Sequence, residues 1–143
     1  MILIDANLLL YAYNPRAAQH HASRLWLERT LAGTNLVRFA WTSIWAFIRI
    51  STSPRVFEHP LSAEEAATIV TSWFAQPVVG PIEPGERHWE ILQELLNDGQ
   101  STGALVMDAA LAAIALEHGA TLYSTDRDFA RFPRLAWIDP LES

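Results

Sequence analysis

The chain has 143 residues, with 16 acidic and 10 basic side chains, a formal net charge of −6 and no cysteine. The lack of cysteine excludes a disulfide framework and a thiolate metal site, and it fits a reducing cytoplasm. The negative charge argues against a surface that binds nucleic acid by phosphate neutralisation alone, although cations bound among carboxylates would change that balance. Because no apolar run approaches the roughly 20 residues of a membrane span, we expect a soluble, cytoplasmic protein.

Apolar runs with strand and helix periods alternate along the whole chain. Strands are predicted at 1–4, 36–41, 78–82, 121–125 and 135–138. Helices are predicted at 8–13, 20–31, 42–50 with Thr42 or Ser43 as the cap, 62–74, 85–96 and 109–117. The alternation predicts one α/β domain over residues 1–143. Its expected form is a three-layer α/β/α sandwich around a mainly parallel sheet of four or five strands.

For two of the predicted helices, the sequence also predicts where particular side chains lie. In helix 85–96, Trp89, Leu92 and Leu96 are expected to lie on one face. Helix 109–117 is apolar except near its start, where Asp108 is expected in or just before the first turn. An aspartate in such an apolar segment is a candidate functional residue.

Carboxylates follow two of the predicted strands. Asp5 comes directly after strand 1–4, and Asp126 follows strand 121–125. In open α/β sheets, ligands bind outside the carboxyl ends of the strands. If the two strands are parallel neighbours, Asp5, Asp108 and Asp126 converge although they are far apart in the sequence.

Each of these carboxylates also has a purely structural explanation. Asp5 could cap the first helix, and Asp108 could interact with the dipole of its own helix. Asp126 and Asp128 could be turn and cap residues of a short helix at 128–132. Residues that only cap separate helices have no reason to lie together, however. The predicted topology brings these carboxylates to one edge of the sheet.

A cluster of carboxylates predicts a bound cation. Like charges repel unless something positive lies among them, and hard oxygen ligands favour Mg²⁺ or Mn²⁺. A metal held in this way can polarise a phosphoryl oxygen and lower the pKa of a bound water. This is the chemistry of metal-dependent nucleases and phosphatases.

Three segments resemble the PIN-domain family, and in particular the VapC toxins of VapBC toxin–antitoxin pairs. They are ILIDANLLLYA at 2–12, WTSIWAFIRISTSPRVF at 41–57 and MDAALAAIALEHGATLYSTDRDFARF at 107–132. The resemblance implies a compact α/β/α domain with Mg²⁺- or Mn²⁺-dependent endoribonuclease activity. It also implies a homodimer and a VapB-like antitoxin that blocks the site.

The resemblance also implies roles for individual residues. Asp5 and Asp108 would be catalytic metal ligands, and Asp126 would complete the cluster directly or through water. Asp128 would be a peripheral member, and Asn7 would help to hold substrate or solvent.

The sequence departs from the family pattern at Ala46. PIN domains usually place a second acid, most often Glu, on the helix that reads SIWAFIRI here, and no Asp or Glu occurs between Glu28 and Glu58. We expect this gap to affect a second metal and the rate more than the fold. Arg49, nearby on the same helix, is expected to contact RNA phosphate or antitoxin, or to pack along the helix.

Ala46 also supports an alternative function. The chain could be a PIN-fold module that binds antitoxin or RNA without cleaving it. Three convergent carboxylates argue against this alternative, because their burial is costly without a metal among them. The hypothesis from the sequence is therefore hydrolysis of RNA phosphodiester bonds at a site built on Asp5, Asp108 and Asp126.

Overall fold

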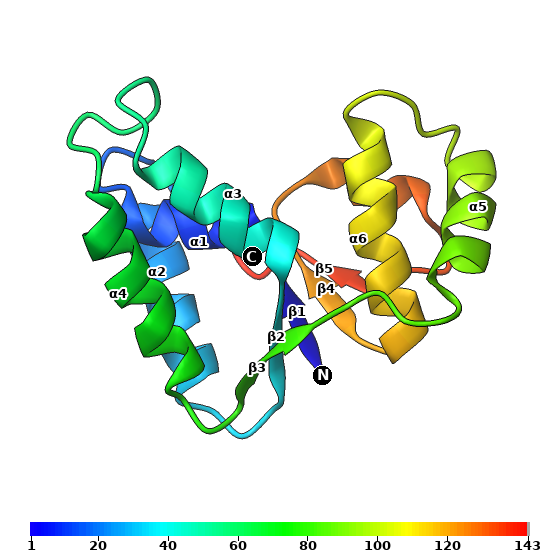
Figure 1. The fold of residues 1–143 in the computed structure, drawn as a ribbon, viewed down its shortest axis with the longest axis horizontal. Coiled ribbons are helices and arrows are strands. Elements are labelled where there is room, and N and C mark those ends of the chain that lie inside the picture. The colour runs from blue at the N-terminus through cyan, green and yellow to red at the C-terminus, as the bar shows by residue number, and fades with distance from the viewer. Residues whose placement is uncertain (143) are drawn as a thin grey trace.

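The computed structural model describes residues 1–142, in which five parallel strands form one sheet (Figure 1). The strand order is β3-β2-β1-β4-β5. The strands are β1 (Ile2–Ile4), β2 (Val37–Ala40), β3 (Val79–Ile82), β4 (Thr121–Tyr123) and β5 (Trp137–Ile138). Because β1 pairs in parallel with β4, their carboxyl ends reach the same edge of the sheet.

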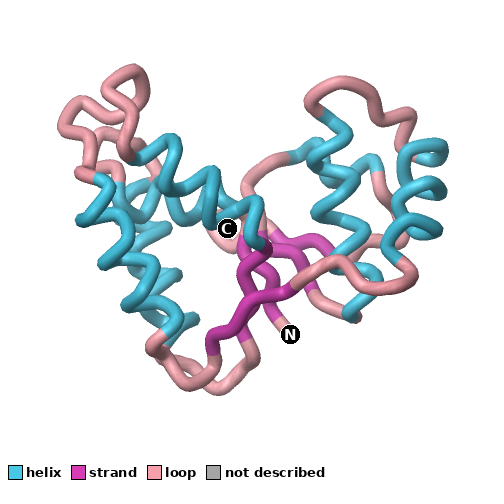
Figure 2. Tube along the Cα trace, viewed as in Figure 1, coloured by secondary structure: helices cyan, strands magenta, loops and turns pink. Residues whose placement is uncertain are grey.

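Six α-helices and one 3₁₀-helix flank the sheet. They are α1 (Ala6–Tyr13), α2 (His20–Leu31), α3 (Trp41–Ser51), α4 (Ala63–Phe74), α5 (His88–Asp98), α6 (Leu105–His118) and the 3₁₀-helix η1 (Arg127–Arg131). Helices α1 to α4 lie on one side of the sheet, and α5 and α6 lie on the other (Figures 1 and 2). The predicted α/β/α class is confirmed. Within residues 1–142, no helix has the length and apolar character to cross a bilayer.

The two sides of the sheet bury different kinds of core. Ile4 faces a core rich in aromatic rings, in which Trp73 packs against Phe39 and Phe47 at centroid distances of 5.4 and 4.8 Å. Leu3 faces the other side, where α6 packs through its many alanines. Consecutive residues of β1 are therefore buried on opposite faces, as expected for the central strand of a parallel sheet. Small side chains let α6 come close to the strands.

Several predicted boundaries are wrong, and two of them concern the site. Helix α6 begins at Leu105 rather than at residue 109, so Asp108 lies within its first turn. Helix α3 begins at Trp41, and Ala40 is its N-cap instead of Thr42 or Ser43. In both cases the chain enters the helix without a side-chain cap, so the usual N-terminal signal is missing or misplaced.

Helix α5 also differs from its prediction. It begins at His88 and not at residue 85. Ile91 and Leu95 are buried, and Leu92 and Leu96 of the predicted face are partly buried against the same core. Trp89 is exposed. The apolar face of α5 is therefore centred on 91 and 95 with 92 and 96 beside it, and position 89 lies outside it.

Candidate active site

The predicted carboxylates gather at the C-terminal edge of the sheet. Asp5 directly follows β1 and is the N-cap of α1. Asp126 follows β4 and is the N-cap of η1. Asp108 reaches the same edge from the first turn of α6. The parallel pairing of β1 with β4 is the reason that the two strand-end residues share this edge.

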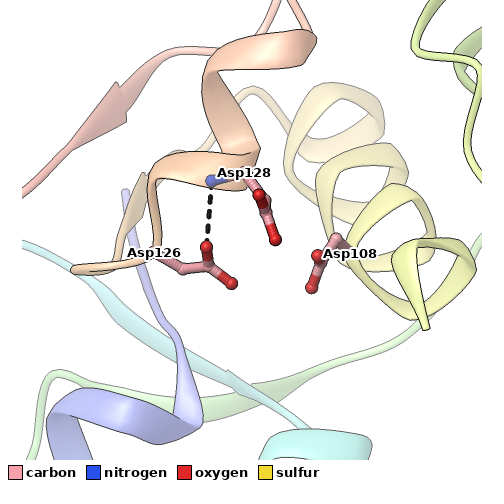
Figure 3. Close-up of side chains that lie close together, drawn as sticks. All are labelled: Asp108, Asp126 and Asp128. Atoms are coloured by element: carbon pink, nitrogen blue, oxygen red, sulfur yellow. Dashed lines mark hydrogen bonds between the residues drawn. The ribbon is translucent and has the colours of Figure 1, made fainter.

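Three of the carboxylates form a tight group (Figure 3). Asp108, Asp126 and Asp128 each offer an oxygen, and these oxygens all lie within 4.8 Å of one another. The Asp128 backbone N–H donates to Asp126 Oδ1 at 2.9 Å, which fixes both residues on the first turn of η1. The sequence places Asp128 at the periphery, whereas the structure brings its carboxylate into the group.

Asp5 lies beside this group without belonging to it. Its Oδ1 accepts a hydrogen bond from the Ala6 backbone N–H at 2.8 Å, and its Oδ2 accepts one from Ser124 Oγ at 2.7 Å. The capping explanation of Asp5 is therefore correct in this structure, and it coexists with a position next to the cluster. Asp5 and Asp108 line the same cleft.

A buried serine that the sequence analysis did not single out links these residues. Ser124 has no exposed surface. Its hydroxyl donates to Asp5 and accepts from Asn7 Nδ2 at 3.2 Å and from the Asp126 backbone N–H at 3.0 Å. The available signal is the order Ser-Thr-Asp after a strand, because a serine two residues before Asp126 can accept from that backbone N–H.

Two of the carboxylates, Asp108 and Asp5, have a raised pKa. Burial, and then the negative charges of Asp126, Asp5 and Asp128, raise the pKa of Asp108 from 3.8 to about 6, against a smaller opposing effect of Arg131. Burial also raises the pKa of Asp5, against hydrogen bonds from Ser124 and Ala6 that lower it. The metal-free site is therefore electrostatically unfavourable at neutral pH, and a cation would relieve the repulsion.

A cleft of about 360 Å³ lies in front of these residues. Helix α6 forms one wall with Met107, Asp108 and Leu111, and α3 forms the other with Thr42, Ser43, Trp45, Ala46 and Arg49. Ala46 therefore lies where a longer acidic side chain would enter the cleft. Among the cleft-lining residues of α3 there is no carboxylate within the described chain.

The residues present fit a hard divalent cation. All the donors are carboxylate oxygens, which Mg²⁺ and Mn²⁺ prefer. In addition, Asn7 Oδ1 is buried and has no hydrogen-bond partner among residues 1–142. A buried amide oxygen without a partner is costly, and a solvent molecule or ligand held by the site would satisfy it.

Known proteins resemble this chain in both sequence and fold. The PIN domain family model matches residues 2–135. Ribonuclease VapC37 of Mycobacterium tuberculosis is 41% identical over 140 residues, which cover 98% of this chain and 97% of that protein. Among solved structures, VapBC-1 from nontypeable Haemophilus influenzae matches with a TM-score of 0.71 at 19% identity, covering 99% of this chain and 100% of that chain. A toxin-antitoxin complex from Klebsiella pneumoniae matches with a TM-score of 0.65 at 17% identity, covering 98% of each chain.

The fold and the site together define the class of protein. It is a parallel α/β sandwich with an acidic cluster at the carboxyl ends of its strands. The chain belongs to the PIN domain family, and its curated relatives are VapC ribonucleases. The resemblance seen in the three sequence segments is thereby confirmed.

Proposed function

We propose that this protein is the toxin of a toxin–antitoxin pair and a metal-dependent endoribonuclease that hydrolyses RNA phosphodiester bonds. The observation that carries the proposal is the group of three carboxylates with oxygens within 4.8 Å of one another. It lies at the sheet edge of a chain that is 41% identical to a protein named Ribonuclease VapC37. The ion that we propose is Mg²⁺, with Mn²⁺ as a substitute.

Each side chain of the site has a proposed role. A bound divalent cation would lower the pKa of a water molecule and neutralise negative charge at the phosphate. Asp108 and Asp126 would hold the cation from α6 and from the end of β4, and Asp5 would face it from the end of β1. Asp128 would add its carboxylate to the same group. Asn7 would hold solvent or substrate through its unpartnered oxygen.

Ser124 would position these groups without touching substrate. Its hydroxyl holds Asp5 Oδ2 at 2.7 Å and the Asp126 backbone at 3.0 Å. Both strand-end acids are therefore fixed by one buried atom, so the site is pre-organised before a cation or substrate arrives.

A VapB-like antitoxin is the partner that we propose. The names of the Haemophilus influenzae and Klebsiella pneumoniae neighbours support it, because both describe toxin–antitoxin assemblies. With RNA as the substrate, we propose that the protein acts in the cytoplasm. The homodimer expected from the sequence stays a prediction.

The test is cleavage of total RNA by the purified protein with Mg²⁺ or Mn²⁺, compared with the same reaction in EDTA and with Asp126→Asn. We expect cutting that needs the metal and is lost in the variant. Asp98→Asn is the matched control, because Asp98 is an exposed aspartate at the end of α5. Failure of the wild-type protein to cut RNA with either metal would contradict the proposal. RNA or antitoxin binding without cutting would then favour the non-catalytic module.

A further inference from the structure

The α3 wall of the cleft carries features that the metal site does not use. Thr42, Trp45, Ala46 and Arg49 follow one another at spacings of three, one and three residues, so they share one face of the helix. All four line the cleft that also contains Asp5 and Asp108. Two of them, Trp45 and Arg49, are large side chains on the exposed part of this face.

Trp45 is more exposed than Trp41, and its ring lacks the contacts that hold the ring of Trp41. Its exposed fraction is 62%, and within residues 1–142 its ring has neither an aromatic partner nor a hydrogen bond. Trp41, one turn earlier, is anchored: its Nε1 donates to Glu83 Oε1 at 3.3 Å, and its ring packs against Phe74 at a centroid distance of 5.8 Å. The ring of Trp45 thus offers an unused flat face at the rim of the cleft.

Arg49 is the one basic side chain among the cleft-lining residues of the described chain. Its guanidinium makes no ion pair or hydrogen bond with residues 1–142. Arg131, on the other side of the cluster, is different, because its guanidinium donates to the Asp128 and Gly99 carbonyls at 3.2 and 2.8 Å. Among the cleft-lining residues of the described chain, Arg49 is therefore the basic side chain whose donors are free for a group that enters the cleft.

We propose that the face formed by Trp45 and Arg49 is a nucleotide subsite for unpaired RNA. Trp45 stacks on a base next to the scissile bond, and Arg49 binds a neighbouring phosphate. This proposal rests on the proposed function, and it adds the form of the substrate and the residues that select it.

The geometry favours an unpaired strand. A phosphate that reaches Asp108 enters a cleft whose opposite wall is α3, so the adjacent nucleotide passes Trp45 and Arg49. A tryptophan ring can stack only on a base whose face is open, and duplex RNA keeps its base faces covered. An unpaired guanidinium beside an acidic cluster also complements the phosphate and offsets the repulsion of the strand by the carboxylates.

The test is a binding measurement with Ca²⁺ in place of Mg²⁺, using a fluorescent eight-nucleotide single-stranded RNA and its blunt-ended duplex. We expect the wild-type protein to prefer the single strand. Trp45→Ala should weaken its binding by about tenfold, and Trp45→Phe should restore most of it, because base stacking on an aromatic ring contributes on this scale. Trp89→Ala is the control, since Trp89 is also 62% exposed but does not line the cleft.

Salt dependence separates the roles of the two side chains. Arg49→Gln should weaken binding and reduce the slope of log affinity against log salt by about 0.7, the value of one phosphate contact on a single strand. Trp45→Ala should leave the slope unchanged. Arg55→Gln is the control, because Arg55 is exposed in the loop after α3 and does not line the cleft.

The outcomes distinguish this inference from the proposed function. If the wild-type protein cuts RNA but Trp45→Ala and Arg49→Gln bind the single strand as tightly as their controls, the subsite is wrong and the ribonuclease stands. If the wild-type protein does not cut RNA, the proposed function fails, and the binding series still decides whether this face holds a nucleotide. If Trp45→Ala changes only the molar mass of the protein in solution, the face is a protein interface and the subsite is overturned.

Discussion

The two walls of the cleft differ in charge although both are helices at the same edge of the sheet. The α6 wall contributes Asp108, whose carboxylate groups with those of Asp126 and Asp128 at the start of η1, with oxygens within 4.8 Å of one another. The α3 wall contributes no carboxylate and presents Ala46, Trp45 and Arg49 instead. We infer that α3 takes no part in holding the cation and is left free to contact substrate.

The two walls also differ in how their helices are packed. Helix α6 is apolar around most of its circumference and is buried through its alanines, so Asp108 is held in place by a helix that is packed on several sides. Helix α3 buries Ile44 and Phe47 on one face and leaves Trp45 and Arg49 on the other. A helix with one exposed face can vary that face without disturbing its core.

The largest expected effect comes from removing an acid from the α6 wall. Asp108→Asn should lower RNA cleavage by about 100-fold or more, since even outer partners of metal ligands commonly cost 10- to 100-fold. The metal-free variant should unfold at a higher temperature at pH 7.5, because the charge that its neighbours disfavour is gone. Cleavage assays and thermal unfolding measure both effects. Wild-type cleavage by this variant would contradict the assignment of the metal to this wall.

The sequence predicts the part of the site that depends on topology. Asp5 and Asp126 follow strands of a sheet predicted to be mainly parallel, and the condition that these two strands are neighbours is met by the pairing of β1 with β4. The position of Asp108 at a helix start was also predictable, although α6 begins four residues before the expected start at residue 109. The alternation of strands and helices places these three residues at element ends, and the strand order brings them together.

The remaining features depend on turn geometry and on contacts between elements, which the predicted elements alone do not give. Asp128 joins the cluster because its backbone N–H bonds to Asp126 Oδ1 in a 3₁₀ turn. Ser124 becomes the link between two strand ends only when β1 and β4 are side by side. The exposure of Trp89 likewise depends on how α5 is rotated about its axis where it packs against the core. Such features are set by tertiary packing, which acts on residues that are distant in sequence.

A second, smaller effect tests how the acids are positioned. Ser124→Ala leaves the Asn7 amide and the Asp126 backbone N–H without their partner. The free energy of unfolding should fall by about 1 to 3 kcal/mol, and cleavage should fall by about 10- to 100-fold. Ser51→Ala is the control, because Ser51 is equally buried but its hydroxyl has no partner in residues 1–142. Equal losses in the two variants would show that Ser124 acts through packing alone.

The difference between the walls can also be reduced by adding an acid to α3. Ala46→Glu places a carboxylate in the cleft opposite Asp108, and we expect affinity for Mg²⁺ or Mn²⁺ to rise by about tenfold, because ligand charge tunes affinity. The metal-free variant should be less stable at pH 7.5. Titration calorimetry measures the affinity, and Ala46→Gln supplies a side chain of the same length without the charge. If Gln raises the affinity as much as Glu, charge on this wall is not the cause.

The smallest expected effect is a change of Mg²⁺ affinity with pH, caused by Asp108 on the α6 wall. The pKa of Asp108 is raised to about 6 in the metal-free protein, so its proton competes with the cation below that pH. Protonation also stabilises the metal-free fold, and this contribution is lost as the pH rises through about 6. The affinity for Mg²⁺ should therefore increase about fourfold between pH 5.5 and pH 7.5 from this group alone.

Calorimetry at the two pH values, with Asp108→Asn beside the wild type, attributes the change to one residue. Burial also raises the pKa of Asp5, so some dependence should remain in the variant and should act in the same direction. Among its cleft-lining residues, the α3 wall has no group that changes charge between pH 5 and pH 8 within the described chain. If the affinity of the wild-type protein for Mg²⁺ is the same at both pH values, the cation is not bound by this group of carboxylates.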